Sequence, residues 1–151
     1  MSNPRILAIM GSGEIAPTMA KVHRELFARF GPEPVPAVIL DTPYGFQENA
    51  DELSARTVRF FADNVRREVA VASYRSREVD ALTAATALAR IREARYLMAG
   101  PGSPSYALRQ WAGGPIPADN FQGRRCQVQI EHNEKGWPKI VAVLPAAKAA
   151  R

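Results

Sequence analysis

The chain has 151 residues and a net charge of +5, and 46% of its residues are hydrophobic, which suits one folded domain with a real core. Its single cysteine, Cys126, excludes an intramolecular disulfide framework and favours a reducing compartment. No apolar run approaches the roughly 18 residues of a membrane span, and the N-terminal apolar run is too short for a signal peptide. We therefore expect a soluble, cytoplasmic protein that does not enter a membrane.

Four short apolar strands are predicted, and they alternate with helical segments. The strands span residues 5–10, 36–41, 67–73 and 94–100, so that their starts lie 31, 31 and 27 residues apart. The apolar runs are continuous rather than alternating, which is typical of parallel strands with both faces covered by helices. This pattern predicts an α/β fold with a parallel sheet of about four strands.

The first two helices are predicted from their apolar period. Pro17 fits a first helical turn, and the helix that follows is expected to end at Gly31. The residues expected to face inward on these two helices are Met19, Val22, Leu26 and Phe30 in the first, and Leu53, Val58, Phe61 and Val65 in the second, over 49–65.

Two further helices are predicted toward the middle of the chain. Residues 77–94 are rich in alanine, the strongest helix former. A short last helix ends near Trp111, with either Ser103 or Ser105 as its N-cap.

The pattern changes after residue 112. Residues 113–123 contain the Gly, Pro and Asn residues typical of a linker. After them, apolar and polar residues alternate on both sides of a possible turn, which predicts a β-hairpin. Residues 121–151 hold 6 Lys or Arg against 2 Asp or Glu, whereas residues 1–120 hold 14 against 13. We expect three parts: an α/β domain over 1–112, a linker over 113–123, and a basic hairpin with a frayed end over 124–151.

Three loops are candidates for a ligand site, because ligands of open parallel sheets bind beyond the carboxyl ends of the strands. The loops are GSGE at 11–14, DTPYGF at 41–46 and GPGSP at 100–104. The candidate substrate-loop and oxyanion residues within them are Gly11, Ser12, Gly13, Glu14, Asp41, Thr42, Gly100, Gly102 and Ser103.

Each loop also has a purely structural interpretation. GSGE either holds an anion at a helix start or forms a tight turn, and it is neither a dinucleotide fingerprint nor a Walker A loop. Asp41 either binds a substrate hydroxyl or amine, or caps the turn through the Thr42 and Tyr44 amides. GPGSP either offers the Gly102 and Ser103 amides as an oxyanion hole or is a rigid turn set by its prolines.

Together, the stretches ILAIMGSGEIAPTM, AVILDTPYGFQENADELSARTVRFF and RYLMAGPGSPSYALRQW resemble class I glutamine amidotransferase-like proteins of the cyanophycinase/peptidase S51-like branch. The resemblance runs from about Arg5 to Trp111. It implies a flavodoxin-like domain and a serine hydrolase that cleaves peptide-like bonds. It also places Gly100–Ser103 where the family has a loop that helps form the oxyanion hole, with the nucleophilic serine on a Gly-x-Ser-Ala-Gly-like elbow after the next strand.

The chain departs from this pattern at the nucleophile. No serine lies in Gly-x-Ser-x-Gly, and none follows Trp111. Ser103 and Cys126 are poor substitutes, and His23 and His132 are expected to be packing or solvated residues rather than bases. No catalytic residue, metal site or cofactor is therefore assigned. The resemblance implies an incomplete, truncated or divergent hydrolase-like domain that is inactive on its own, with a small peptide-like substrate.

Two alternatives remain open. The tail weakly resembles a phage-encoded family linked to recombination and single-stranded DNA binding, and it could meet single-stranded nucleic acid through basic and aromatic side chains. Those candidates are Arg124, Arg125, Lys135, Trp137 and Lys139. The other alternative is a chimeric or frame-shifted chain without a selected function, with its junction near Asn120.

Overall fold

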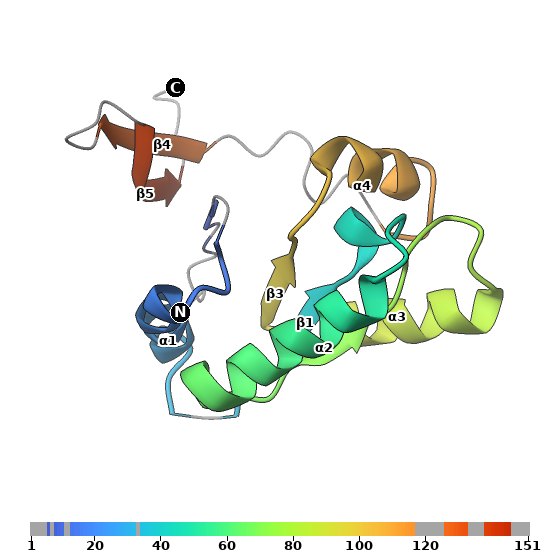
Figure 1. Ribbon diagram of the computed structural model, residues 1–151, viewed down its shortest axis with the longest axis horizontal. Coiled ribbons are helices and arrows are strands. Elements are labelled where there is room, and N and C mark those ends of the chain that lie inside the picture. Colours follow the sequence, from blue (N-terminus) through green and yellow to red (C-terminus); the bar gives the residue numbers. More distant parts are fainter. Residues whose placement is uncertain are drawn as a thin grey trace, which may run out of the picture. The chain divides into compact units, whose positions relative to one another are not determined.

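The computed structural model describes residues 6, 8–10, 13–32, 34–116, 126–132 and 138–145. The chain divides into two compact units. One is Gly13–Ala118, and the other combines Met1–Ser12 with Asp119–Arg151. Figure 1 shows the helices and strands of the chain.

A parallel sheet forms the centre of the Gly13–Ala118 unit. Its strands are β1 (Ala37–Leu40), β2 (Ala70–Ala72) and β3 (Tyr96–Ala99), in the order β2-β1-β3. Both pairings are parallel, and all four residues of β1 are buried. A strand buried on both faces requires a continuous apolar run, which is what the sequence carries there. The predicted α/β class with a parallel sheet is thus confirmed for three strands.

The fourth predicted strand, over 5–10, is not confirmed. Ile6 and residues 8–10 lie outside any strand, while Arg5 and Leu7 lie outside the described residues. Ile6 and Ile9 are 42% and 46% exposed, unlike residues of a central parallel strand. An apolar run is compatible with a strand, but it forms one only where a neighbour accepts its hydrogen bonds.

The first helix begins as predicted but buries a different face. A 3₁₀ turn, η1 (Pro17–Met19), leads into α1 (Ala20–Ala28), with Pro17 in the first turn. The buried residues of α1 are Ala20, His23 and Phe27. The prediction that Val22 faces inward is wrong, since Val22 is exposed. Leu26 and Phe30, which were also expected to face inward, are half-buried. A buried histidine takes the centre of the apolar face.

The second predicted helix consists of a regular α-helix followed by a π-helical turn. α2 (Ala50–Phe60) continues into a wide π-helical turn, η3 (Phe61–Val65), and the left-handed Arg66 ends it. Phe61 and Val65 are buried as predicted, and Leu53 and Val58 are half-buried.

The last two helices have side-chain caps. α3 (Ala81–Glu93) begins after Asp80, whose carboxylate accepts a hydrogen bond from the Thr83 amide. α4 (Pro104–Trp111) begins after Ser103, whose hydroxyl accepts one from the Tyr106 amide. Of the two predicted caps, Ser103 is therefore the one used.

The core lies in two layers, one on each face of the sheet. Ala37, Tyr96 and Met98 point into a cluster with α1, α2 and η3. The alternate strand residues Val38, Leu40 and Ala72 point into a second cluster with α3. Ile116, within the segment predicted as a linker, is buried in the second cluster.

The other unit contains two strands, β4 (Cys126–His132) and β5 (Pro138–Pro145). They pair antiparallel, with an irregularity between Gln129 and Ile130. Residues 133–137, where the turn of the predicted hairpin falls, lie outside the described residues.

Candidate functional site

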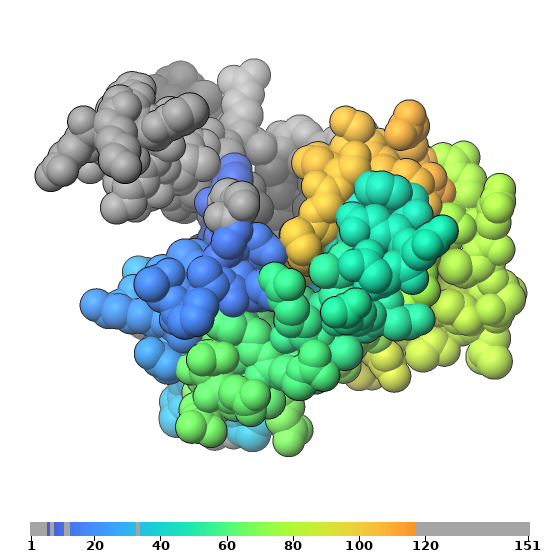
Figure 2. Space-filling model, viewed as in Figure 1, coloured from blue at the N-terminus to red at the C-terminus, as the bar shows by residue number. Residues whose placement is uncertain are grey.

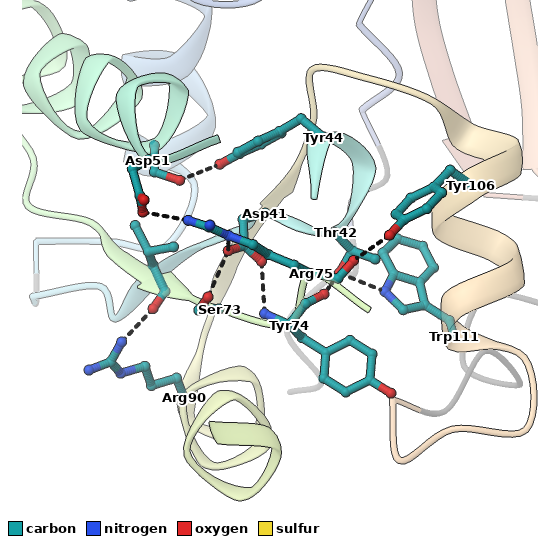
Figure 3. Close-up of polar contacts among 12 residues, drawn as sticks. Asp41, Thr42, Tyr44, Asp51, Ser73, Tyr74, Arg75, Arg90, Tyr106 and Trp111 are labelled. Carbon is teal, nitrogen blue, oxygen red and sulfur yellow. Dashed lines mark hydrogen bonds and ion pairs between the residues drawn. The ribbon is translucent and has the colours of Figure 1, made fainter. Parts of the chain in front are cut away.

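Three loops meet at the carboxyl edge of the sheet (Figure 3). The loop after β1 contains Asp41 and η2 (Thr42–Tyr44), and the loop after β3 contains Gly100–Ser103. The third loop, Ser73–Arg75, follows β2 and was not among the predicted site loops. Figure 2 shows the segments of η2 and α4 side by side on the viewed face of the molecule.

Asp41 is the centre of a hydrogen-bond network. Its carboxylate is fully buried, and it accepts hydrogen bonds from the Ser73 hydroxyl at 2.8 Å, the Tyr74 amide at 2.7 Å and Arg75 Nε at 3.2 Å. The Tyr44 amide donates to the backbone oxygen of Asp41 instead, at 3.2 Å. The Asp41 side chain therefore caps the loop of the neighbouring strand, not the Thr42 and Tyr44 amides.

Arg75 extends this network toward solvent. Its Nη2 lies 2.5 Å from Asp51 Oδ1, and the Asp51 side chain is 92% exposed. Burial by itself lowers the pKa of Arg75, but hydrogen bonds and charge from Asp51 and Asp41 outweigh burial and raise it. The cluster of two carboxylates and one guanidinium thus keeps a net negative charge.

Thr42 and Tyr106 join α4 to the same loops (Figure 3). The buried Thr42 hydroxyl donates to the Tyr74 carbonyl at 2.5 Å and accepts from Trp111 Nε1 at 3.1 Å. The Tyr106 hydroxyl donates to the Arg75 carbonyl at 3.1 Å. These contacts hold the three loops and α4 together as one framework.

Gly102 and Ser103 lie directly against the loop after β1. Gly102 has φ +133°, and a side chain there would overlap the Pro43 carbonyl oxygen, so only glycine fits. The Ser103 amide donates to the same oxygen at 2.8 Å, and the Ser103 hydroxyl caps α4. The structure thus brings two of the three predicted loops together, with the Ser103 amide already hydrogen-bonded.

The remaining predicted loop, at residues 11–14, makes its contacts away from the other two. Gly13, with φ +92°, forms a tight turn in which the Ala16 amide donates to the Gly13 carbonyl. The Glu14 carbonyl accepts from His23 Nε2, and the other ring nitrogen of His23 meets the Tyr96 hydroxyl, at the amino end of β3. His23 therefore links this loop to the amino end of β3, while the other candidate loops follow the carboxyl ends. Gly11 and Ser12 lie outside the described residues.

His23 is fully buried among aromatic rings. Its ring centroid lies 4.9 Å from that of Phe61 and 5.7 Å from that of Phe60. Both of its polar contacts are 2.7 Å long. Because the Glu14 carbonyl can only accept, Nε2 carries the proton and Nδ1 accepts from the Tyr96 hydroxyl. Burial lowers the pKa of His23, and the backbone bond and charge of Glu14 offset only part of this shift.

The residues of the alternative nucleic-acid site fall mostly outside the described part. Arg124, Arg125, Lys135 and Trp137 lie outside it, and Lys139 is in β5, in register with Glu131 of β4. Cys126 and His132 lie at the two ends of β4.

Ser73 and Arg75 were missed because no glycine or proline marks the loop after β2, and Asp51 was missed because it lies in the first turn of α2, outside any loop. The rule that located the other loops would have found this one, since Ser73 ends the predicted strand.

Two features are absent from the described residues. None of the helices there is long and apolar enough to cross a bilayer, and no three His, Cys, Asp or Glu side chains gather closely enough to hold a metal ion.

Comparison with known proteins adds no relative: no family model, no curated protein and no solved structure matches the chain.

Proposed function

We propose that the Gly13–Ala118 unit is a divergent hydrolase-like α/β domain that binds a small peptide-like ligand at its carboxyl edge without cleaving it. The observation that carries this proposal is the contact of Gly102 and Ser103 with Pro43. It joins two loops at the edge where open parallel sheets bind ligands, and it occupies the Ser103 amide that an oxyanion hole would need.

The chemistry around this contact suits the amino end of a peptide. Phe46 is 55% exposed and packs on Tyr106 with ring centroids 5.0 Å apart, which offers an apolar surface to a side chain. Arg75 is linked to Tyr106 through its carbonyl and to Asp51 through its guanidinium. The exposed Asp51 carboxylate, in a net negative cluster, favours an ammonium group.

The same contacts argue against serine chemistry. The Ser103 hydroxyl accepts from the Tyr106 amide, and its own amide is bound to Pro43. Ser73 donates to Asp41, but that carboxylate also accepts hydrogen bonds from the Tyr74 amide and from Arg75 Nε, so it serves to hold this loop in place.

Binding and catalysis can be tested separately. The amide of the dipeptide Phe-Gly, which has a free amine and no carboxylate, should cause saturable NMR shifts at Phe46, Gly102 and Tyr106. The N-acetylated form of this dipeptide amide should bind more weakly to the protein. The form with a free amine should in turn bind more weakly to the Asp51→Asn variant than to the unaltered protein. Absence of saturable shifts at these residues would refute the binding proposal. A serine-directed fluorophosphonate should not label the chain, and labelling that is lost in Ser103→Ala would refute the inactive assignment.

The basic C-terminal region supports a second proposal, binding of single-stranded nucleic acid. Residues 121–151 hold 6 basic against 2 acidic residues, and such an excess of positive charge attracts a phosphate backbone. Fluorescence anisotropy with a labelled single strand should show binding that falls steeply with salt and weakens in Trp137→Ala. No binding at low salt would eliminate this function.

A further inference from the structure

A cavity of about 240 Å³, open to solvent and lined in part by exposed side chains, lies beside the carboxyl end of β2. Ser73 comes from the loop after β2, and the other lining residues come from α3; the lining is Ser73, Leu82, Thr83, Thr86, Ala87 and Arg90. Thr83, Thr86, Ala87 and Arg90 are spaced by three or four residues, so they share one face of the helix. We propose that this cavity binds the carboxylate of an apolar amino acid or of the C-terminal residue of a peptide.

Arg90 is the charged group of this site. It is the only charged residue among the described residues that line the cavity. Its guanidinium donates to the Val71 carbonyl, which fixes its position at the edge of β2 (Figure 3). That bond uses one of five N–H groups, and a guanidinium binds a carboxylate through two parallel bonds.

The hydroxyl groups of the cavity complement a different part of the ligand. Ser73 donates to Asp41 at 2.8 Å, Thr83 to Asp80 at 2.6 Å, and Thr86 to the Leu82 carbonyl at 2.8 Å. A hydroxyl has one proton, so these three oxygens are left as acceptors. A ligand that carries an N–H beside its carboxylate, as an amino acid or a peptide end does, matches this arrangement.

The size and apolar lining of the cavity define the ligand further. Leu82 is 77% exposed at its border, and Ala87 is buried. Pockets for drug-sized ligands enclose roughly 300–1,000 Å³, so this cavity suits a single residue with an apolar side chain. The inference goes beyond the proposed function, because it concerns a second site, and it shares with that function only the peptide chemistry of the ligand. The cavity is lined from α3 and the loop after β2, whereas Gly100–Ser103 follows β3, on the other side of β1 in the sheet.

Titration of the full chain with N-acetyl-leucine, followed by NMR, tests the site. We expect saturable shifts at Ser73, Thr83 and Thr86, and at least about tenfold weaker binding of N-acetyl-leucinamide, which lacks the carboxylate. Equal affinity for the acid and the amide, or no saturable shift at these residues, would overturn the proposal. This comparison uses the unaltered protein and does not depend on the stability of a variant.

A pair of variants tests whether Arg90 is the residue that binds the ligand carboxylate. Arg90→Gln should remove the preference for the acid, whereas Arg92→Gln, on the same helix but outside the cavity lining, should keep it. Retention of the preference in a folded Arg90→Gln would contradict the assignment. Phe-Gly amide has no carboxylate and does not test the Arg90 site. If it caused no saturable shifts at Phe46 and Gly102, only the proposed function would be refuted. Failure of N-acetyl-leucine alone would refute only this inference.

Discussion

Acidification should destabilise the Gly13–Ala118 unit through the buried His23. The folded-state pKa of His23 lies below the ordinary value of 6.5, chiefly because of burial. The unfolded chain therefore takes up a proton first. The contribution of His23 to stability is fully present above pH 6.5 and is lost as the pH falls from 6.5 toward the lowered folded-state pKa.

The contacts of His23 explain why its protonation is unfavourable in the folded protein, and proton linkage gives the size of the effect. A second proton would lie on Nδ1, which now accepts from the Tyr96 hydroxyl, so that hydroxyl would have to turn away. The charged ring would also be surrounded by Phe60, Phe61 and Tyr96, with the Glu14 charge as partial compensation. The loss should approach about 1.4 kcal/mol for each pH unit within this window.

Denaturant unfolding between about pH 7.5 and about pH 5 measures this loss above the range in which most carboxylates titrate. His23→Gln should be less stable at neutral pH but should lack the additional loss on acidification. His132→Gln is the matched control, because the chain has two histidines, and it should retain the loss. An unchanged pH dependence in His23→Gln, or an NMR titration of His23 at or above pH 6.5, would refute the reasoning.

Three further predictions concern stability, each measured by thermal or denaturant unfolding. The Tyr74 hydroxyl is buried without a hydrogen-bond partner among the described residues, so Tyr74→Phe should be neutral or stabilising by up to about 1 kcal/mol, whereas Tyr96→Phe should cost about 1 kcal/mol. A destabilised Tyr74→Phe would contradict this assignment. Gly102→Ala should cost more than about 2 kcal/mol, since its side chain would overlap a backbone oxygen, and Gly31→Ala, in open space, should cost only about 1 kcal/mol. Equal costs would mean that the close approach is absent. Asp41→Ala should cost about 3 kcal/mol, because it leaves the Ser73 hydroxyl and the Tyr74 amide unpaired, and a cost below about 1 kcal/mol would show that the network does not hold the loops together.

The sequence by itself determined the local structure of the α/β unit. Continuous apolar runs predicted β1, β2 and β3. Pro17 marked one helix start and the serines at 103 and 105 marked another, since both signals act between residues close in the chain. The same reasoning located the loops that contain Asp41 and Gly102, because each follows a strand.

Only the tertiary structure decided which residues meet. The order β2-β1-β3 places Asp41 against residues 32 to 34 positions away, and it turns that carboxylate into a link between two loops. His23 reaches Tyr96 across 73 positions and is buried in spite of its polarity. Periodicity describes one element at a time, whereas these contacts depend on which strands are neighbours and on which helix face the sheet covers. The expected strand over 5–10 was not confirmed for the same reason, since an apolar run does not specify a partner for its hydrogen bonds.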